Sequence, residues 1–319
     1  MNARLRFVCT RVALTVPVLL LMSVFIFMMI HLVPGDPVRT MLGFRATPEN
    51  VREVTHSLGL DKPLLQQYLD WLGGLLHGDL GQDYISRESL GHLLAQSLPV
   101  TLELTLVAMV LAVVVGIPLG VQAATGPGWV RRLTEGFVVA GISIPDFWLG
   151  IMLVLVFTQV LNVLPPSGYV PFVQDPAQNL RYMLLPIVTL AVGETAYILR
   201  TTKAAMEEVL DRPFIVYLRA KGVRRLPLTF RHALRNAAVP IATVVGIQFG
   251  VLLGGAIVIE TLFALPGVGR LVVTAINQRN YPVVQAGVLV IAALFLLVTL
   301  LTDLVIGWLD PRVADGARQ

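Results

Sequence analysis

Four acidic residues interrupt the long apolar segments of this 319-residue chain, at Glu103, Asp146, Glu194 and Asp303. An ionisable group in such a segment is costly, so it usually lines a polar pathway or pairs with a neighbouring helix. Glu194, near the middle of its segment, is expected to face a cavity or another helix. Asp146 follows Pro145, and a proline within a membrane helix leaves a backbone carbonyl without its helical partner. Asp146 and Glu194 are therefore candidate pathway residues, with a structural hydrogen-bonding role as the alternative. Glu103 and Asp303 lie near segment ends, where a structural role is expected.

The residue patterns of common enzymes are missing from the sequence. None of the three lysines, Lys62, Lys203 and Lys221, lies in a G-x-x-x-x-G-K-[ST] phosphate loop, and neither G-x-S-x-G nor H-E-x-x-H occurs. The five histidines lie without the i, i+4 spacing of a helical metal site. We therefore predict no catalytic, cofactor-binding or metal-binding residue, and no ATP hydrolysis by this chain alone.

The composition indicates a membrane protein. Hydrophobic residues make up 55% and charged residues 14% of the chain, and the mean hydropathy is +0.76. A soluble domain of this length would not need so much apolar surface, because its exterior faces water. The net charge of +4 would suit nucleic acid, but the cations lie beside apolar segments, where orientation in a bilayer explains them better. The predicted partner is the lipid bilayer and not nucleic acid. The single cysteine, Cys9, excludes an intrachain disulfide and a cysteine-based metal cluster.

Six apolar segments are long enough to cross a bilayer as helices, which takes roughly 20 residues each. They predict an all-α, polytopic membrane protein with six transmembrane helices. The segments cover residues 12–33, 100–124, 137–163, 183–199, 239–262 and 283–309. Gly193 and Glu194 interrupt the fourth segment. The first follows several arginines, as a signal sequence would, but no small-x-small pattern ends it, so we interpret it as an uncleaved helix.

These segments divide the chain into four regions. Residues 1–33 form the first membrane helix, 34–98 an extracytoplasmic helical region, 99–309 the membrane core, and 310–319 a cytoplasmic tail. In the extracytoplasmic region, Thr47 followed by Pro48 marks the start of a helix, Gly59 marks its end, and Pro63 starts a second helix. We expect this region either to lie on the membrane surface or to form a platform for an external partner.

The densest positive charge lies in residues 200–236, between the fourth and fifth apolar segments. This loop holds nine cationic residues: Arg200, Lys203, Arg212, Arg219, Lys221, Arg224, Arg225, Arg231 and Arg235. Since cationic loops stay on the cytoplasmic side, both chain termini are predicted to be cytoplasmic as well. Gly222 in the middle of the loop and Pro240 at the next membrane entry indicate a helix–turn–helix. That form is typical of a docking element for a soluble partner.

The chain resembles the permease subunits of binding-protein-dependent ABC importers, in their dipeptide, oligopeptide and nickel branch. The resemblance rests on short motifs that follow one another along the whole chain. These are PGDP (34–37), LGLDKP (58–63), HGDLG (77–81), TLEL (101–104), RAKG (219–222), HALRNA (232–237), PGVGR (266–270), YPVVQ (281–285) and DPR (310–312). The resemblance implies the type I ABC importer permease fold, with an extracytoplasmic helical layer between the first two membrane helices, in the cytoplasmic (inner) membrane of a bacterium.

In that family the cytoplasmic loop carries the signature E-A-A-x-x-x-G, followed by I-x-L-P. Gly222 matches the glycine, and the bulky residues 216–218 replace the small ones of the signature. The resemblance implies that this loop couples the chain to separate ATPase subunits. The implied coupling residues are Asp211, Arg212, Phe214, Ile215, Tyr217, Leu218, Arg219, Ala220, Lys221 and Gly222. We expect Phe214, Ile215 and Leu218 to insert into a groove of the partner. Arg212, Arg219 and Arg224 are expected to pair with acidic residues around that groove.

The resemblance also implies a mechanism and further partners. Two ATP-binding cassette subunits, which hold the ATP and magnesium, would pull on the helix within residues 211–222. The six-helix bundle would then rock against a second, homologous permease, expected to form a heterodimer with this chain, and open a central pathway alternately to either side. An extracytoplasmic substrate-binding protein would deliver short peptides. No cofactor is implied for this chain itself.

Other functions stay open on the sequence. An importer of nickel, a metal chelate or glutathione would belong to the same family, because the external binding protein selects the ligand. An ion-coupled secondary transporter would need inverted repeats with broken helices in both halves, which we do not find. A membrane-embedded enzyme would need a nucleophile and a base, and no such pattern is present.

Overall fold

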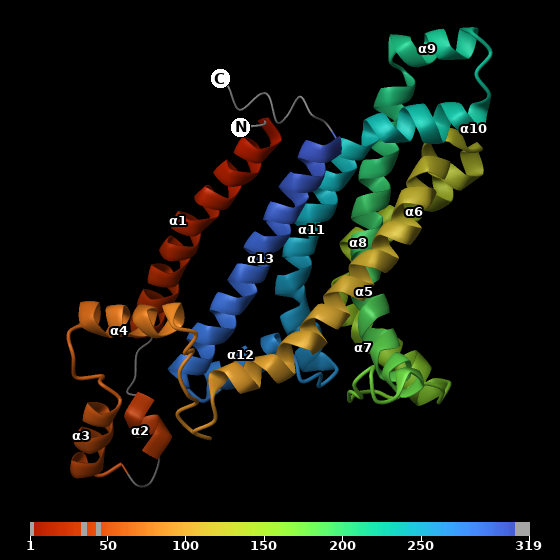
Figure 1. Cartoon of the computed structure of the whole chain (residues 1–319). Helices are drawn as coiled ribbons and strands as arrows, with labels where there is room; N and C mark the ends of the chain where they lie inside the picture. The colour runs from red at the N-terminus through yellow and green to blue at the C-terminus, as the bar shows by residue number, and fades with distance from the viewer. Residues whose placement is uncertain (1–2, 33–36, 43–45, 310–319) are drawn as a thin grey trace.

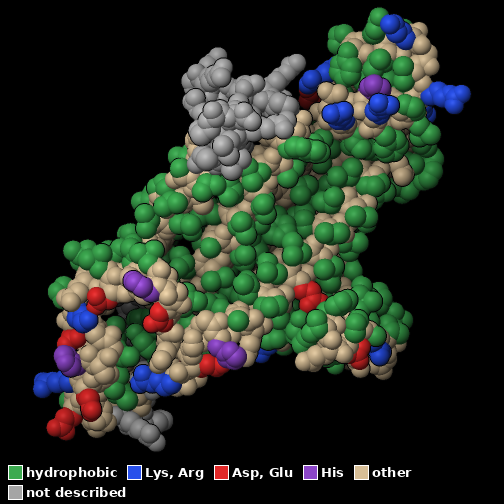
Figure 2. Space-filling view, in the orientation of Figure 1, with side chains coloured by type: hydrophobic (Ala, Val, Ile, Leu, Met, Phe, Trp, Pro, Cys, Tyr) green, Lys and Arg blue, Asp and Glu red, His purple; other side chains and the backbone are tan. Residues whose placement is uncertain are grey.

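The computed structural model is a bundle of long helices with short helices at both ends (Figure 1). It describes residues 3–32, 37–42 and 46–309. Within these ranges the regular structure is helical, and an isolated β-bridge joins Gln82 and Ser89. Charged side chains gather at the two ends of the bundle, and the face between them is mostly hydrophobic (Figure 2). The all-α membrane architecture predicted from the composition is confirmed.

Five helices are long and apolar enough to cross a membrane. They contain the first, second, fourth, fifth and sixth predicted segments, and each begins before the predicted apolar part. These helices are α1 (Ala3–Leu32), α5 (Leu90–Thr125), α8 (Pro176–Leu210), α11 (Leu234–Leu262) and α13 (Tyr281–Leu309). The helices exceed the apolar segments because hydropathy marks only the part that needs lipid or protein around it, whereas helical hydrogen bonding continues beyond it.

The third predicted segment, residues 137–163, is not one straight helix. It is divided between α6 (Gly128–Ser143), α7 (Asp146–Val154) and a π-helical turn, η2 (Leu155–Val160), and the chain bends by 100° between α6 and α7. The cause is Pro145, because the residue before a proline avoids the helical conformation. Ile144 accordingly has extended dihedral angles of φ −83° and ψ 121°. Counted as one crossing, the bent pair gives the predicted total of six.

α8 continues through the fourth segment without a break. Its start is fixed by Asp175, whose carboxylate accepts hydrogen bonds from two backbone N–H groups of the first turn at 3.0 Å each. Pro176 occupies the first helical position. Gly193 and Glu194 interrupt the apolar segment but not the helix, because a single glycine costs a helix only about 1 kcal/mol and packing against other helices outweighs this cost.

The most extensive helix packing in the described part of the chain joins α5 to α8. A Cβ atom on Gly120 would lie 2.6 Å from the Cβ of Thr202 and 2.8 Å from the carbonyl oxygen of Leu199, so only glycine fits at this crossing. In a bilayer, close backbone approach of this kind holds helices together, because lipid tails are as apolar as the side chains. α5, α8 and α11 share an apolar core that includes the fully buried Leu104, Met183 and Leu252.

The region that the sequence predicts to be extracytoplasmic forms its predicted helices in the part that the structure describes. α2 (Pro37–Leu42), α3 (Pro48–Ser57) and α4 (Leu64–Leu76) lie together at one end of the bundle (Figure 1). Thr47 caps α3, and Gly59, with φ +66°, turns the chain after it. Tyr68 and Trp71 of α4 pack against Phe27 of α1, with ring centroids 5.4 Å and 6.1 Å apart. Through these rings α4 is fixed to the first membrane helix.

Some predicted features lie outside the described residues. They are residues 34–36 of the PGDP motif, residue 33 at the end of the first apolar segment, and the tail 310–319 with its DPR motif.

Candidate coupling helix and translocation face

A short helix projects beyond the bundle within the loop 200–236. α9 (Pro213–Ala220) connects α8 to α10 (Arg225–Pro227), and the π-helical turn η3 (Leu228–Ala233) then leads into α11. It lies at the end of the bundle where α1 begins and α13 ends (Figure 1). α9, the turn at Gly222 and α10 together form the helix–turn–helix that the sequence predicts.

Both ends of α9 follow from its sequence. Pro213 occupies the first helical position, where a missing N–H has no consequence. After the helix, Gly222 adopts a φ of +80°, and its N–H donates to the Arg219 carbonyl at 3.0 Å. The Val223 N–H donates to the Leu218 carbonyl at 3.2 Å, which completes a Schellman turn. A Cβ on Gly222 would meet no atom of the described residues within 4 Å, so the surface there is open to a partner.

One side chain anchors α9 to the bundle. Ile215 is fully buried in an apolar cluster with Val121 of α5 and Met206 of α8. Leu218 is partly buried against the same cluster. The expectation that Ile215 inserts into a partner is therefore wrong. The inner face of this short helix must pack on its own bundle, and Ile215 lies on that face.

The outer side of α9 presents aromatic and cationic groups. Phe214 is 38% exposed and Tyr217 is 59% exposed. The Lys221 ammonium lies 4.7 Å from the centre of the Tyr217 ring, which is a cation–π contact. Asp211, Arg219 and Ala220 are exposed as well. Lys and Arg side chains gather at this end of the molecule (Figure 2). Aromatic anchors surrounded by cations are suited to a groove with acidic edges.

The three arginines expected to meet a partner differ in their surroundings. Arg212 donates to the carboxylate of Glu208 at 2.6 Å, in its own chain. Arg219 and Arg224 are exposed and form no ion pair with the residues that the structure describes. Arg219 lines a cavity of about 450 Å³ between α9, η3 and the end of α5, beside Arg225, which donates to the Thr125 carbonyl. Arg219 and Arg224 are thus the cations best placed for an external acidic group.

The two candidate pathway carboxyls lie near the helix break, close enough to interact electrostatically. Asp146 is the first residue of α7, and its carboxylate would lie 3.2 Å from a Cβ placed on Gly193 of α8. Glu194, the next residue of α8, is only 8% exposed, and its Oε2 atom has no hydrogen-bond partner. The side chain of Gln248, on α11, lies close to the Glu194 side chain. No group of three or more His, Cys, Asp or Glu suited to a metal ion occurs in the described part of the chain.

A groove beside this pair runs between α6 and α8. It has a volume of about 450 Å³ and extends from Ser143, the last residue of α6, to Lys203 of α8. Lys203 lies 2.6 Å from the Glu135 carboxylate, which also pairs with Arg131 at 3.1 Å. Polar groups therefore occur at both ends of the α6–α8 face.

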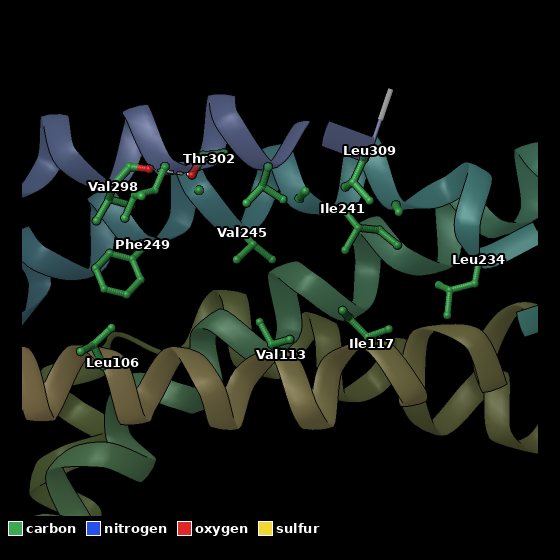
Figure 3. Close-up of a pocket in the computed structure, with 15 residues that line it drawn as sticks. Leu106, Val113, Ile117, Leu234, Ile241, Val245, Phe249, Val298, Thr302 and Leu309 are labelled. Carbon is green, nitrogen blue, oxygen red and sulfur yellow. Dashed lines mark hydrogen bonds between the residues drawn. The ribbon is translucent and has the colours of Figure 1, made fainter. Parts of the chain in front are cut away.

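A second groove has a different character. It has a volume of about 500 Å³ and is lined by α5, α11 and α13. Val113 of α5 faces Val245 of α11 across it (Figure 3). The hydroxyl of Thr302 donates to the Val298 carbonyl at 2.8 Å and is thereby satisfied. Because its lining is almost wholly apolar, this groove suits lipid tails or apolar side chains and offers few groups to a polar solute.

Glu103 and Asp303 have partners within the chain, as expected of structural groups. The Tyr169 hydroxyl donates to Glu103 at 2.8 Å, and the Arg11 guanidinium lies 3.0 Å from the Asp303 carboxylate. Tyr169 lies in the connection between η2 and α8, where burial, and then the nearby Glu103 carboxylate, raise the pKa of its hydroxyl.

Another buried acid, Glu260 near the end of α11, was missed among the sequence candidates. It is completely buried, and both of its carboxylate oxygens are bonded. One accepts the Thr101 hydroxyl at 2.6 Å and the other accepts the Arg270 N–H, in the first turn of α12 (Val268–Asn277), at 2.9 Å. A Cβ on Gly267 would lie 2.3 Å from the Glu260 Cδ. Glu260 therefore holds the start of α12 against α5. The signal in the sequence is the PGVGR motif that follows soon after it.

Two family profiles match the chain. The family described as "binding-protein-dependent transport system inner membrane component" matches residues 116–315. The corresponding N-terminal family matches residues 4–105.

Relatives match over nearly the whole length. A protein of Brucella abortus, provisionally named a peptide transport system permease, is 40% identical over 95% of this chain and 97% of its own length. The dipeptide transport system permease protein DppB of Escherichia coli is 39% identical over 97% of this chain and 98% of its own. A chain of the MetNI methionine ABC transporter, solved in inward-facing conformations, superposes with a TM-score of 0.55 at 19% identity, covering 68% of this chain and 96% of that one. The expected type I ABC importer permease fold is confirmed.

Proposed function

This chain belongs to the family of binding-protein-dependent transport system inner membrane components, and on that premise we propose that it is the translocation-pathway subunit of an ABC importer for short peptides. Family membership makes it a multi-pass transport subunit and not an enzyme. Such a subunit works with separate ATPase subunits and a substrate-binding protein. Peptides are supported as the substrate by the names of relatives that match over nearly the full length, from Escherichia coli and Pseudomonas aeruginosa.

The observation that carries the proposal is the way α9 is mounted. Its outer side offers Phe214 and Tyr217 to a partner, while Ile215 fixes its inner side among residues of α5 and α8. A force applied to the outer side is therefore passed to two membrane-spanning helices. This is what a permease needs if closure of an ATPase subunit is to change which side of the membrane the pathway faces.

The second half of the pathway would come from another permease. The α6–α8 face carries polar groups at both of its ends. We propose that this face meets a second, homologous permease, in a heterodimer, and that the pathway opens alternately to either side between them.

The experiment that tests this function is reconstitution. The chain is purified with its partner permease, two ATP-binding cassette subunits and the binding protein, placed in liposomes, and supplied with labelled dipeptide. We expect uptake that needs ATP and that ceases when this chain is omitted. Absence of peptide uptake by the complete, ATP-hydrolysing complex would refute the assigned substrate class.

We predict that the isolated chain does not hydrolyse ATP. The reason is that no lysine lies in a phosphate-binding loop. ATPase activity should appear only when the two cassette subunits are added. The measurement is phosphate release by the rigorously purified single chain, with the assembled complex as the positive control. Turnover by the single chain above a buffer blank would contradict the prediction.

The orientation is a separate prediction, made from the cationic loop. In a Cys9→Ser background, Pro48→Cys on α3 should react with a membrane-impermeant thiol reagent added outside intact cells, and Arg224→Cys should react only after permeabilisation. Both positions are exposed, so access and not burial decides the result. Labelling of Arg224→Cys, but not of Pro48→Cys, in intact cells would reverse the topology.

A further inference from the structure

We propose that Asp146, Glu194 and Gln248 form a subsite that binds the protonated amino group of the transported peptide. The inference rests on the proposed function and adds to it the place in the membrane, and the chemical group, by which the substrate is recognised.

The geometry of the subsite comes from the helix break. The 100° bend at Pro145 ends α6 and restarts the chain as α7 with Asp146 as its first residue. Asp146 is thereby turned toward Gly193, the neighbour of Glu194 on α8, and Gln248 reaches Glu194 from α11. Three elements thus contribute two carboxyls and an amide to one place. An ammonium group has three N–H donors, which can be shared among these oxygen acceptors.

Comparison with Glu260 indicates that Glu194 binds a ligand and is not only a structural, packed acid. Glu260 is fully buried, and each of its oxygens accepts a hydrogen bond from the chain, as a buried structural acid requires. Glu194 is more than nine-tenths buried as well, yet its Oε2 atom accepts none. An unpaired buried oxygen is costly, so its persistence indicates that a donor from outside the chain completes the site.

The charge of the site points to a cation. No lysine, arginine or histidine forms an ion pair with Asp146 or Glu194 in the described part of the chain, and Lys203 on the same helix is already held by Glu135. Two adjacent carboxyls in surroundings of low dielectric constant repel one another when both are ionised. A bound ammonium relieves that repulsion and is attracted by both groups.

The site is also accessible. Asp146 is partly buried, and the residues after it, Phe147 and Trp148, are 50% and 47% exposed. Ser143, at the break, lines the α6–α8 groove. A peptide moving along this face can therefore bring its amino end to the acidic pair, and the exposed aromatic rings offer further favourable surfaces to a cation.

Peptide uptake by the reconstituted importer tests the proposal. Asp146→Asn and Glu194→Gln should each lower the initial rate of uptake of a dipeptide with a free amino group by at least about tenfold, with normal assembly of the complex. Asp146→Glu, which keeps the charge, should retain most of the rate. The matched control is Asp303→Asn, which removes a carboxyl paired with Arg11 elsewhere in the spans and should import at the wild-type rate.

A labelling experiment tests the chemical class of the ligand directly. A hydrophobic carbodiimide modifies carboxyls in apolar surroundings, and mass spectrometry measures its attachment to Glu194 in the detergent-solubilised complex. The free dipeptide at millimolar concentration should slow this modification, and the N-acetylated dipeptide at the same concentration should not. Equal protection by both peptides, or by neither, would overturn the assignment of an ammonium site.

The outcomes distinguish the two proposals. If the wild-type complex imports no peptide, the proposed function is wrong and the subsite falls with it. If the wild type imports peptide and Asp146→Asn imports it equally well, only the subsite is wrong. A loss that Asp146→Glu does not relieve would assign the residue to packing, and would also overturn the subsite.

Discussion

Replacing Glu260 with alanine is expected to destabilise the chain by about 3–5 kcal/mol, enough to deplete the folded permease from the membrane. The change removes the acceptor for the Thr101 hydroxyl and for the Arg270 N–H, at a completely buried position. It also leaves a cavity beneath Gly267 and Gly269, both of which pack directly on the carboxyl group. The fraction of chain that remains monodisperse after heating in detergent, measured by fluorescence-detected gel filtration, reports the loss.

A matched control uses a half-buried acid of α8. Glu207 makes only a long contact of 3.9 Å with Lys203, so Glu207→Ala should keep the wild-type melting temperature within a few degrees. Glu260→Gln keeps one oxygen acceptor and should lie between the two. If Glu260→Ala melts with the wild type, the carboxyl does not hold α12 against α5, and the PGVGR motif needs another explanation.

Much of the architecture could be predicted from the sequence, because the bilayer imposes a length and an apolar composition on every crossing helix. Hydropathy located the parts of α1, α5, α8, α11 and α13 that need an apolar environment, but not the ends of these helices. The bend at Pro145 was not predicted. A proline within a membrane helix either is tolerated or breaks it, according to neighbours that a single sequence does not reveal.

For the functional residues too, some properties could be predicted from the sequence and others depend on the tertiary structure. The cost of a charge in an apolar segment is a local property, so Asp146 and Glu194 could be identified from the sequence. That they lie together depends on the bend and on the packing of α7 against α8, which is a tertiary property. Ile215 shows the same limit, since an eight-residue helix does not reveal from its sequence which side its bundle covers. The docking roles of the remaining α9 residues stay predictions.

Gly222→Asp is expected to leave membrane insertion intact and to lower ATP-dependent uptake by at least about tenfold. Glycine adopts the φ of +80° in the Schellman turn without a steric penalty, whereas aspartate adopts it at a cost of about 1 kcal/mol. Because α9 is anchored to the bundle, it can tolerate this cost. The larger effect comes from outside the chain. The position is open in this subunit and surrounded by cations, so a partner that meets it should carry acidic groups, which would repel the new carboxylate. Co-purification of the ATPase subunits and peptide uptake are the two measurements.

Two control variants separate the backbone from the partner. Gly222→Asn has the same size and tolerates a positive φ, but carries no charge, so it should retain more assembly than Gly222→Asp. Gly78 has the same φ of +80° and equally open surroundings, at the opposite end of the bundle, so Gly78→Asp imposes the same backbone cost away from the ATPases. Assembly should therefore survive in Gly78→Asp and fail in Gly222→Asp. Equal loss in both would place the cause in the turn itself, and wild-type uptake by Gly222→Asp would show that the ATPases do not dock at α9.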